Sequence, residues 1–290
     1  MTASVLYPSA CILGEGPVWH CERESCLWVD IEQNFLYEYK WHEKRVQRWE
    51  LEYKVTLVIP CSKEQVLLAL QGGLARFDLN NNKLTWLLDI EKEYQEHRCN
   101  DGCCDPRGRL WVGTLHMQFK KGAGSLYCIN EHLEMSKKLD NLTISNGMAW
   151  SPDGTRMYFI DSPTQTVQQF IYHEEKAAIS FEKIAIHIPK DMGAPDGMAI
   201  DEEGMLWIAH YGGFGVYRWN PVTGKPVDSI ILPVPNVTSC AFVGEDLDHL
   251  LITTASQELS EEECIKFPQS GHVFIARLPV RGVKGYDCLI

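Results

Sequence analysis

An internal repeat constrains the fold of this chain more strongly than any other feature of its 290 residues. The segment 195–210 (PDGMAIDEEGMLWIAH) closely resembles the segment 145–161 (SNGMAWSPDGTRMYFID). Each unit combines a turn-forming stretch with a short run of apolar, aromatic and β-branched residues, as in DPRGRLWVGT (105–114). Three glycines that begin such units lie 45 and 50 residues apart: Gly102, Gly147 and Gly197. About six units of this size fill the chain.

Periods of 40–50 residues with about four short strands each are the signature of a β-propeller. We therefore expect an all-β fold, a six-bladed β-propeller formed by residues 1–290 as a single domain. We expect a strand within 4–13 to close the ring by pairing near 273–278, because closure removes exposed sheet edges. A β-sandwich is the alternative, but it does not predict this self-similarity. Helix is expected only as short turns at 91–98 and 259–264.

Composition excludes several classes of protein. Hydrophobic residues make up 45% of the chain, which is too many for a disordered protein. The formal net charge of −12 disfavours binding to a phosphate backbone, so we expect no nucleic-acid partner. No apolar run is long enough to span a membrane, and the N-terminus does not resemble a secretory signal. The 11 cysteines include no C-x-x-C pair, which favours free thiols and a cytoplasmic location.

One position of the repeat carries an oxygen donor in every unit where it can be aligned. In a propeller the first strand of each blade lines the central channel, so this position forms a ring around the axis. The ring residues are Glu15, Asp101, Asn146, Asp196 and Ser239. Converging carboxylates repel one another unless a cation lies between them, and such oxygens suit Ca²⁺, Mg²⁺ or Mn²⁺. The alternative is that Asp-Gly and Asn-Gly merely form turns, but glutamate is not a turn residue.

The common catalytic motifs are absent. The chain has no G-x-S-x-G elbow of a serine hydrolase, no H-E-x-x-H zinc motif and no phosphate-binding P-loop. The ten histidines show no metal-ligand spacing, and only His116 and His210, at predicted strand ends, stand out as candidates. The predicted ring therefore remains the main candidate for chemistry.

Five motifs resemble one known family along nearly the whole chain. They are LGEGPVW (13–19), RCNDGCCDPRGRLWVGT (98–114), ISNGMAWSPDGTRMYFIDS (144–162), PDGMAIDEEGMLWIAHYGG (195–213) and TSCAFVG (238–244). Their order and spacing are similar to those of the gluconolactonase and regucalcin (senescence marker protein) family. The resemblance implies a six-bladed propeller that holds one divalent metal ion in its channel and hydrolyses sugar-acid lactones.

The resemblance also implies roles for particular residues. The family's metal ligands correspond to Glu15, Asn146 and Asp196, all three of which the repeat had already placed in the ring. The ion itself remains open among Ca²⁺, Zn²⁺, Mn²⁺ and Mg²⁺. Asp196 is the expected proton acceptor for the attacking water. Asp101, which follows in the family's R-x-N-D-G motif, is expected near a metal-bound water.

The expected substrate contacts are Arg98 and Asn100, from the same R-x-N-D-G motif. Animal regucalcins carry an acidic residue after G-T-M-x, whereas this chain has GTLHMQ (113–118), so Gln118 or His116 takes that place. This departure leaves the identity of the sugar lactone open. A related propeller that hydrolyses organophosphates would need an apolar pocket, whereas these polar residues favour a polyol.

We therefore expect a metal-dependent lactonase whose partner is a small sugar lactone. The alternative is a calcium-binding regulatory protein of the regucalcin type with little turnover. A propeller scaffold of the WD type is disfavoured, because the Gly-His and Trp-Asp signatures of that class are missing.

Overall fold

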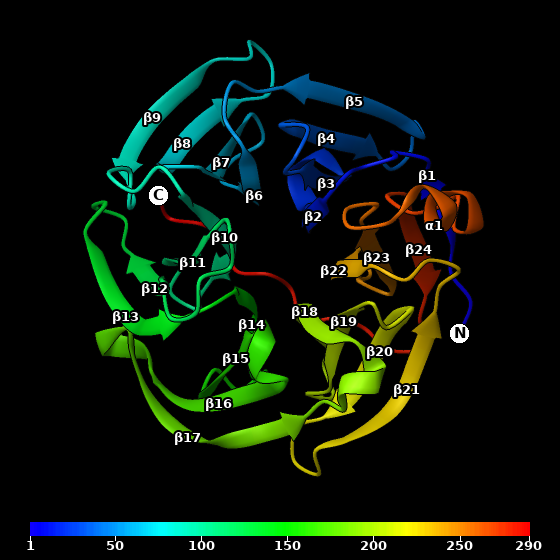
Figure 1. Cartoon of the computed structure of the whole chain (residues 1–290). Coiled ribbons are helices and arrows are strands. Elements are labelled where there is room, and N and C mark those ends of the chain that lie inside the picture. The colour runs from blue at the N-terminus through cyan, green and yellow to red at the C-terminus, as the bar shows by residue number, and fades with distance from the viewer.

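The computed structural model describes residues 1–290 and contains six antiparallel sheets of four strands each. Figure 1 shows these sheets as blades around a central channel, with one strand of each blade facing the axis. The prediction of an all-β, six-bladed β-propeller is confirmed. No helix is both long and apolar enough to cross a membrane.

Each blade is a meander whose strands run outward from the channel. The first three blades consist of β2 (Gly14–His20), β3 (Ser25–Asp30), β4 (Phe35–Lys40) and β5 (Arg45–Glu50); β6 (Val55–Pro60), β7 (Gln65–Leu70), β8 (Gly73–Asp78) and β9 (Leu84–Asp89); and β10 (His97–Cys104), β11 (Leu110–His116), β12 (Gly124–Ile129) and β13 (Met135–Leu142). The fourth and fifth consist of β14 (Ser145–Trp150), β15 (Arg156–Asp161), β16 (Thr166–His173) and β17 (Ala178–His187); and β18 (Ala194–Ile200), β19 (Leu206–Tyr211), β20 (Gly215–Asn220) and β21 (Lys225–Ile231). The sixth consists of β22 (Val237–Val243), β23 (His249–Thr254), β24 (Val273–Arg277) and, on its outer edge, β1 (Ser4–Tyr7).

The N-terminal strand closes the ring as predicted. β1 pairs antiparallel with β24, with Ser4 opposite Ile275 and Val5 opposite Phe274. The sixth blade thus takes three strands from one end of the chain and one from the other. This pairing covers the edge of β24, which would otherwise expose unpaired backbone groups.

The core is divided into six clusters of buried apolar side chains, each between two neighbouring blades. The repeated tryptophan of the L-W-V and L-W-I runs accounts for part of this packing. Trp28, Trp111 and Trp207 lie in the second strands of their blades and have no exposed surface. Because each blade contributes to two clusters, the blades stabilise one another around the ring.

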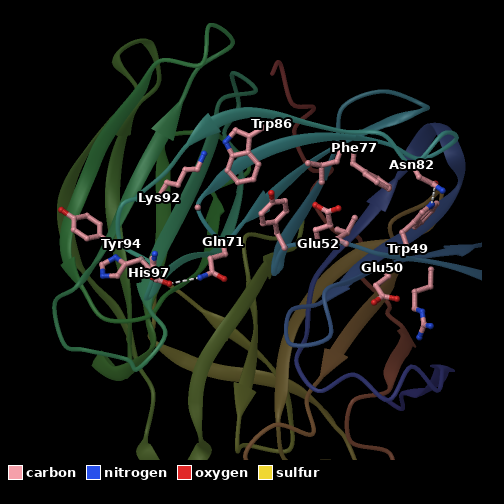
Figure 2. A pocket seen from close by; sticks show the side chains of 16 residues that line it. Trp49, Glu50, Glu52, Gln71, Phe77, Asn82, Trp86, Lys92, Tyr94 and His97 are labelled. Carbon is pink, nitrogen blue, oxygen red and sulfur yellow. Dashed lines mark hydrogen bonds between the residues drawn. The ribbon is translucent and has the colours of Figure 1, made fainter.

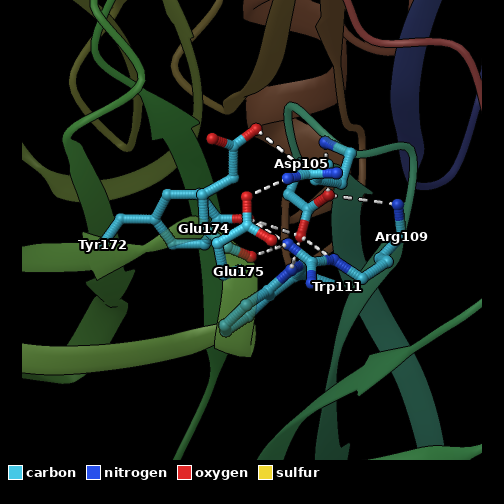
Figure 3. Close-up of polar contacts among 7 residues, drawn as sticks. Asp105, Arg109, Trp111, Tyr172, Glu174 and Glu175 are labelled. Atoms are coloured by element: carbon cyan, nitrogen blue, oxygen red, sulfur yellow. Dashed lines mark hydrogen bonds and ion pairs between the residues drawn. The ribbon is translucent and has the colours of Figure 1, made fainter.

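The repeated turns are held by buried aspartates. Asp105 in the turn between β10 and β11 accepts hydrogen bonds from the Trp111 indole N–H (2.9 Å) and the Tyr172 hydroxyl (2.7 Å), and it pairs with Arg109 (Figure 3). Asp201 makes the equivalent bonds to Trp207 and Arg218 in the fifth blade. Aspartates in the predicted turns therefore also form tertiary hydrogen bonds that hold strands and blades together.

One of the two expected helical turns is present. Helix α1 (Glu261–Lys266) begins after Ser260, whose side chain and that of Glu263 form a capping box. The expectation for 91–98 is wrong, because β10 already begins at His97 and the preceding residues form turns. Tertiary hydrogen bonds hold that segment instead, among them Gln71 Nε2 to the carbonyl of Gln95 (2.9 Å).

The C-terminal segment 279–290 crosses one end of the channel (Figure 1). Backbone hydrogen bonds join it to the turns of three blades, including Val283 N–H to Ile200 and Leu289 N–H to Gly108. These turns follow the innermost strands. The opposite end of the channel, where the innermost strands begin, carries the predicted ring.

Candidate metal centre

The innermost strands are irregular at the predicted ring position. Pairing with the second strand shifts register at this point in each of the four blades that carry the ring's carboxylates and amide. The shifts fall between Glu15 and Val18, Cys99 and Gly102, Ser145 and Met148, and Pro195 and Met198. A bulge of this kind redirects a side chain that a regular strand would point elsewhere. The local irregularity therefore sets the direction of the ring side chains.

Two of the glycines that follow ring residues serve the close approach of neighbouring blades. A Cβ atom on Gly147 would lie 2.6 Å from the carbonyl oxygen of Asp196, and one on Gly197 would lie 2.0 Å from Ser239 Oγ. These glycines lie inside β14 and β18, so the interpretation of the dipeptides as simple turns is wrong. They bring Asn146 and Asp196 against the next blade.

A chain of hydrogen bonds joins the predicted substrate residues to a predicted metal ligand. Arg98 Nη1 donates to Asn100 Oδ1 (2.5 Å), and Asn100 Nδ2 donates to Asn146 Oδ1 (2.9 Å). Asn146 Nδ2 in turn donates to Ser162 Oγ (2.8 Å). Arg98, Asn100 and Asn146 are all at least 92% buried. The two groups of residues that the sequence treated as separate therefore lie in one network.

Three carboxylates of the ring influence one another. Burial, and then repulsion from Asp101, raises the pKa of Glu15. Burial, and then the charges of Glu15 and Asp101, raises the pKa of Asp196 well above its usual range. Burial raises the pKa of Asp101 to about 6. Arg98 opposes the shifts at Glu15 and Asp196, so these groups lie close enough to share one electrostatic environment.

The charges of this site do not balance within the protein. Glu15, Asp101 and Asp196 contribute −3 when ionised and Arg98 contributes +1, which leaves −2. A divalent cation would neutralise the excess, and the donors on offer are the carboxylate and amide oxygens that hard cations prefer. The residues present therefore fit such an ion.

Ser162 was not singled out from the sequence, although it fixes the amide of Asn146. It is 94% buried in the short turn after β15. The only feature of the sequence that could have identified Ser162 is its position directly after the repeated strand that ends at Asp161. That aspartate accepts hydrogen bonds from the backbone N–H groups of Thr143 and Ile144, and so fixes the start of β14.

Gln118 lies at the same end of the channel but not in the network. It is exposed in the turn after β11, and its backbone N–H donates to His116 Nδ1 (3.1 Å). His116 is buried. It lies opposite His97, which is the residue that precedes Arg98 in the chain. The side chain of Gln118 has no hydrogen bond to the ring.

His210 supports the strand that carries Asp196. It is fully buried opposite Pro195, and its Nδ1 hydrogen bonds with the carbonyl of Met192 (2.9 Å). Burial lowers the pKa of His210 to about 4. The histidine is therefore neutral, and its role is structural. It occupies the strand position that is held by aspartates in the first and fourth blades, Asp30 and Asp161.

Two other features lie away from the ring. An exposed group of Glu24, His42 and Glu245 joins turns of the first and sixth blades. A cavity of about 1290 Å³ lies between the first and second blades, where Trp49, Trp86 and other side chains line it (Figure 2). Neither contains any of the predicted site residues.

Comparison with known proteins gives consistent matches. Residues 13–256 match the family model described as SMP-30/Gluconolactonase/LRE-like region. YvrE of Bacillus subtilis, a candidate sugar lactone lactonase, is 34% identical over 273 residues that cover 94% of each chain. Human regucalcin is 34% identical over 294 residues, which cover 97% of this chain and 96% of the relative. The crystal structure of a calcium-binding protein, regucalcin, from Agrobacterium tumefaciens superimposes with a TM-score of 0.95 at 27% identity, covering 100% of this chain and 98% of that one.

Proposed function

This chain belongs to the SMP-30/gluconolactonase/LRE-like family, and we propose that it hydrolyses a sugar-acid lactone to the open-chain acid with the help of one divalent metal ion. The observation that carries this proposal is the ring of three carboxylates, Asp196 buried and Glu15 and Asp101 partly buried, opposed by a single arginine. That arrangement is costly unless a cation shares the site.

Glu15, Asn146 and Asp196 would hold the ion, and their donor atoms suit Ca²⁺, Mg²⁺, Mn²⁺ or Zn²⁺. When bound, such an ion supplies a Lewis acid for the lactone carbonyl and lowers the pKa of a water. The hydrogen bond from Asn100 to the Asn146 amide orients that group, and Ser162 holds its other end. The amide oxygen is therefore kept in a fixed direction before any ligand binds.

The remaining residues position the substrate and move a proton. Arg98 offers guanidinium donors beside the ring, suited to hydroxyl groups and a carbonyl oxygen. Asp196 accepts the proton of the attacking water, and its raised pKa makes its carboxylate a stronger base than one in water. The water oxygen then adds to the lactone carbonyl carbon. The ring C–O bond breaks, and the proton held by Asp196 passes to the leaving ring oxygen, which gives the acid and a hydroxyl group.

A calcium-binding regulatory role without turnover is the second candidate. It is supported by the name of the Agrobacterium relative, a calcium-binding protein. The two candidates share the ring and differ only in whether a lactone is hydrolysed there.

The test is a panel of sugar lactones assayed with metal-stripped protein to which single divalent ions are added back. We expect no turnover without metal and restored turnover with at least one ion. Asp196→Ala should lose both the ion and the activity, whereas Asp228→Ala, on the exposed outer strand of the same blade, should keep both. Undiminished hydrolysis by the stripped protein would refute the metal dependence. Tight binding of the ion without turnover of any lactone would favour the regulatory role.

A further inference from the structure

A tyrosine links the fifth and sixth blades at the end of the channel that carries the ring. Tyr211 ends β19 and lies opposite Ala194, which precedes Asp196 by two residues. The Tyr211 hydroxyl donates to the carbonyl of Gln257 (3.1 Å) and to Glu258 Oε2 (3.3 Å). Both acceptors belong to the segment that leaves β23 of the sixth blade. One hydroxyl therefore fixes this segment beside the strand that carries Asp196.

The same tyrosine reaches toward the first blade. Ala255, in the segment that leaves β23, pairs with Leu13, which precedes Glu15 by two residues. The ring of Tyr211 packs against the apolar cluster that contains Leu13 and Ala255. Tyr211 is thus in contact with groups that lie just outside two of the predicted metal ligands, Glu15 and Asp196. It forms part of the wall of the channel mouth above the ring.

The charges agree with this placement. Burial, and then the charge of Glu258 and the hydrogen bond to it, raise the pKa of Tyr211, and the charge of Asp196 adds to the shift. Tyr211 therefore keeps its proton at neutral pH and can donate it to Glu258. The hydrogen bond is to a charged acceptor, which is the stronger kind.

Glu258 is free to bind a further group. Its side chain is exposed, it forms no ion pair, and only its Oε2 atom has a donor in the protein. Its backbone has a φ of +66°, a conformation that glycine adopts without strain and that other residues adopt rarely. The conformation of the loop therefore does not explain why a glutamate stands at this position.

A neutral sugar needs an acceptor of this kind. Sugar hydroxyl groups both donate and accept hydrogen bonds, whereas the Arg98 guanidinium only donates. The ring carboxylates would be occupied by the metal ion. The third blade, which carries Arg98, and the sixth blade, which carries Glu258, face each other across the channel (Figure 1). Glu258 therefore places an acceptor on the wall opposite the arginine donors.

We propose that Glu258, held by Tyr211, determines specificity for polyhydroxylated lactones by accepting hydrogen bonds from hydroxyl groups that lie away from the reacting carbonyl. This inference rests on the proposed function, because it assigns a residue to the same lactone site. Tyr211 acts as a positioning residue that keeps the carboxylate at the channel mouth. A lactone without hydroxyl groups gains nothing from Glu258.

The test compares two kinds of lactone with the metal-loaded full chain: the sugar lactone that the wild-type protein prefers, and δ-valerolactone, which has no hydroxyl groups. Glu258→Gly removes the carboxylate and suits the backbone conformation, so the variant is expected to fold. It should lower kcat/KM for the sugar lactone by about 10- to 150-fold, mainly through KM, and change that for δ-valerolactone by less than about twofold.

Three further variants define the role of the carboxylate. Glu258→Gln keeps a neutral acceptor and should lose less than Glu258→Gly. Tyr211→Phe should raise KM for the sugar lactone, because the carboxylate is no longer held. Glu262→Gln changes an exposed glutamate of α1 in the same connection between β23 and β24 and should have no effect. The metal content should stay near one equivalent in all of them.

A second readout does not require turnover. Binding of the matching sugar lactams, which are not hydrolysed, is measured by calorimetry and should weaken in Glu258→Gly. Unchanged kcat/KM and unchanged lactam binding in this variant would overturn the inference, as would an equal loss on δ-valerolactone or no lactam binding by the wild-type protein. If the wild-type protein hydrolysed no lactone but bound lactams through Glu258, the proposed function would fail and the inference would stand.

Discussion

Replacing Asp105 by alanine tests how the blades are anchored. The carboxylate is fully buried and accepts hydrogen bonds from five donors: the backbone N–H groups of Arg107 and Arg109, the Arg109 side chain, the Trp111 indole and the Tyr172 hydroxyl (Figure 3). Tyr172 belongs to the fourth blade, so this one side chain joins two blades.

The expected loss in the free energy of unfolding depends on which of these donors can form a hydrogen bond with another partner. The backbone groups and Arg109 lie near solvent, but Trp111 is fully buried and its N–H would stay unpaired. A lost hydrogen bond to a charged group costs about 1.5–3 kcal/mol, and breaking a buried ion pair costs about 3–5 kcal/mol. We expect the free energy of unfolding to fall by about 3–5 kcal/mol. With an unfolding entropy of about 0.6 kcal/mol/K for a chain of this length, Tm should fall by about 5–8 °C.

The assay is thermal unfolding followed by circular dichroism, with Asp153→Ala as the matched control. Asp153 lies in the equivalent turn of the fourth blade but is exposed and bonds only to Ser151 and Thr155. Its loss should lower Tm by less than about 2 °C. If Asp105→Ala melted within 2 °C of the wild-type protein, the aspartate would not be an anchor and the reasoning would fail.

Three further predictions concern closure, substrate and pH. Deleting residues 1–8 removes β1 and should lower Tm sharply, whereas deleting residues 1–2 should not; equal melting of both would contradict closure by this strand. Arg98→Ala should reduce kcat/KM for the preferred lactone by roughly 10- to 150-fold and leave about one equivalent of metal bound, while Gln118→Glu should change the preference among lactones more than the rate. Loss of the metal in Arg98→Ala would show that the arginine supports the ion through Asn100. Because the folded pKa of His210 (about 4) lies below its unfolded value, the unfolded chain binds the extra proton between pH 6.5 and 4. Stability should therefore decrease as pH falls through that window, by at most about 1.4 kcal/mol per unit, and His210→Gln should show a shallower slope in urea titrations.

The repeat in the sequence determined the fold. Strand-sized apolar runs, turn signals and a period of 45–50 residues are local properties of the chain, so they predict blades and their number without knowledge of contacts. The same period placed Glu15, Asn146 and Asp196 at one level of the channel before any geometry was known. Closure by the N-terminal strand followed from the cost of an exposed sheet edge.

Tertiary structure alone decided which side chains meet. The bulges in the innermost strands redirect the ring residues, and Asn100 bonds to Asn146 across a blade boundary 46 residues away in sequence. The segment 91–98 carries a local helical signal, but hydrogen bonds to neighbouring blades hold it in turns. Cys61, Cys104 and Cys288 line one cavity only because the C-terminal segment crosses the closed ring. Periodicity encodes the blades because each unit folds under the same local forces. Contacts between blades depend on the closed ring and on non-repeating segments, for which a periodic pattern carries no information.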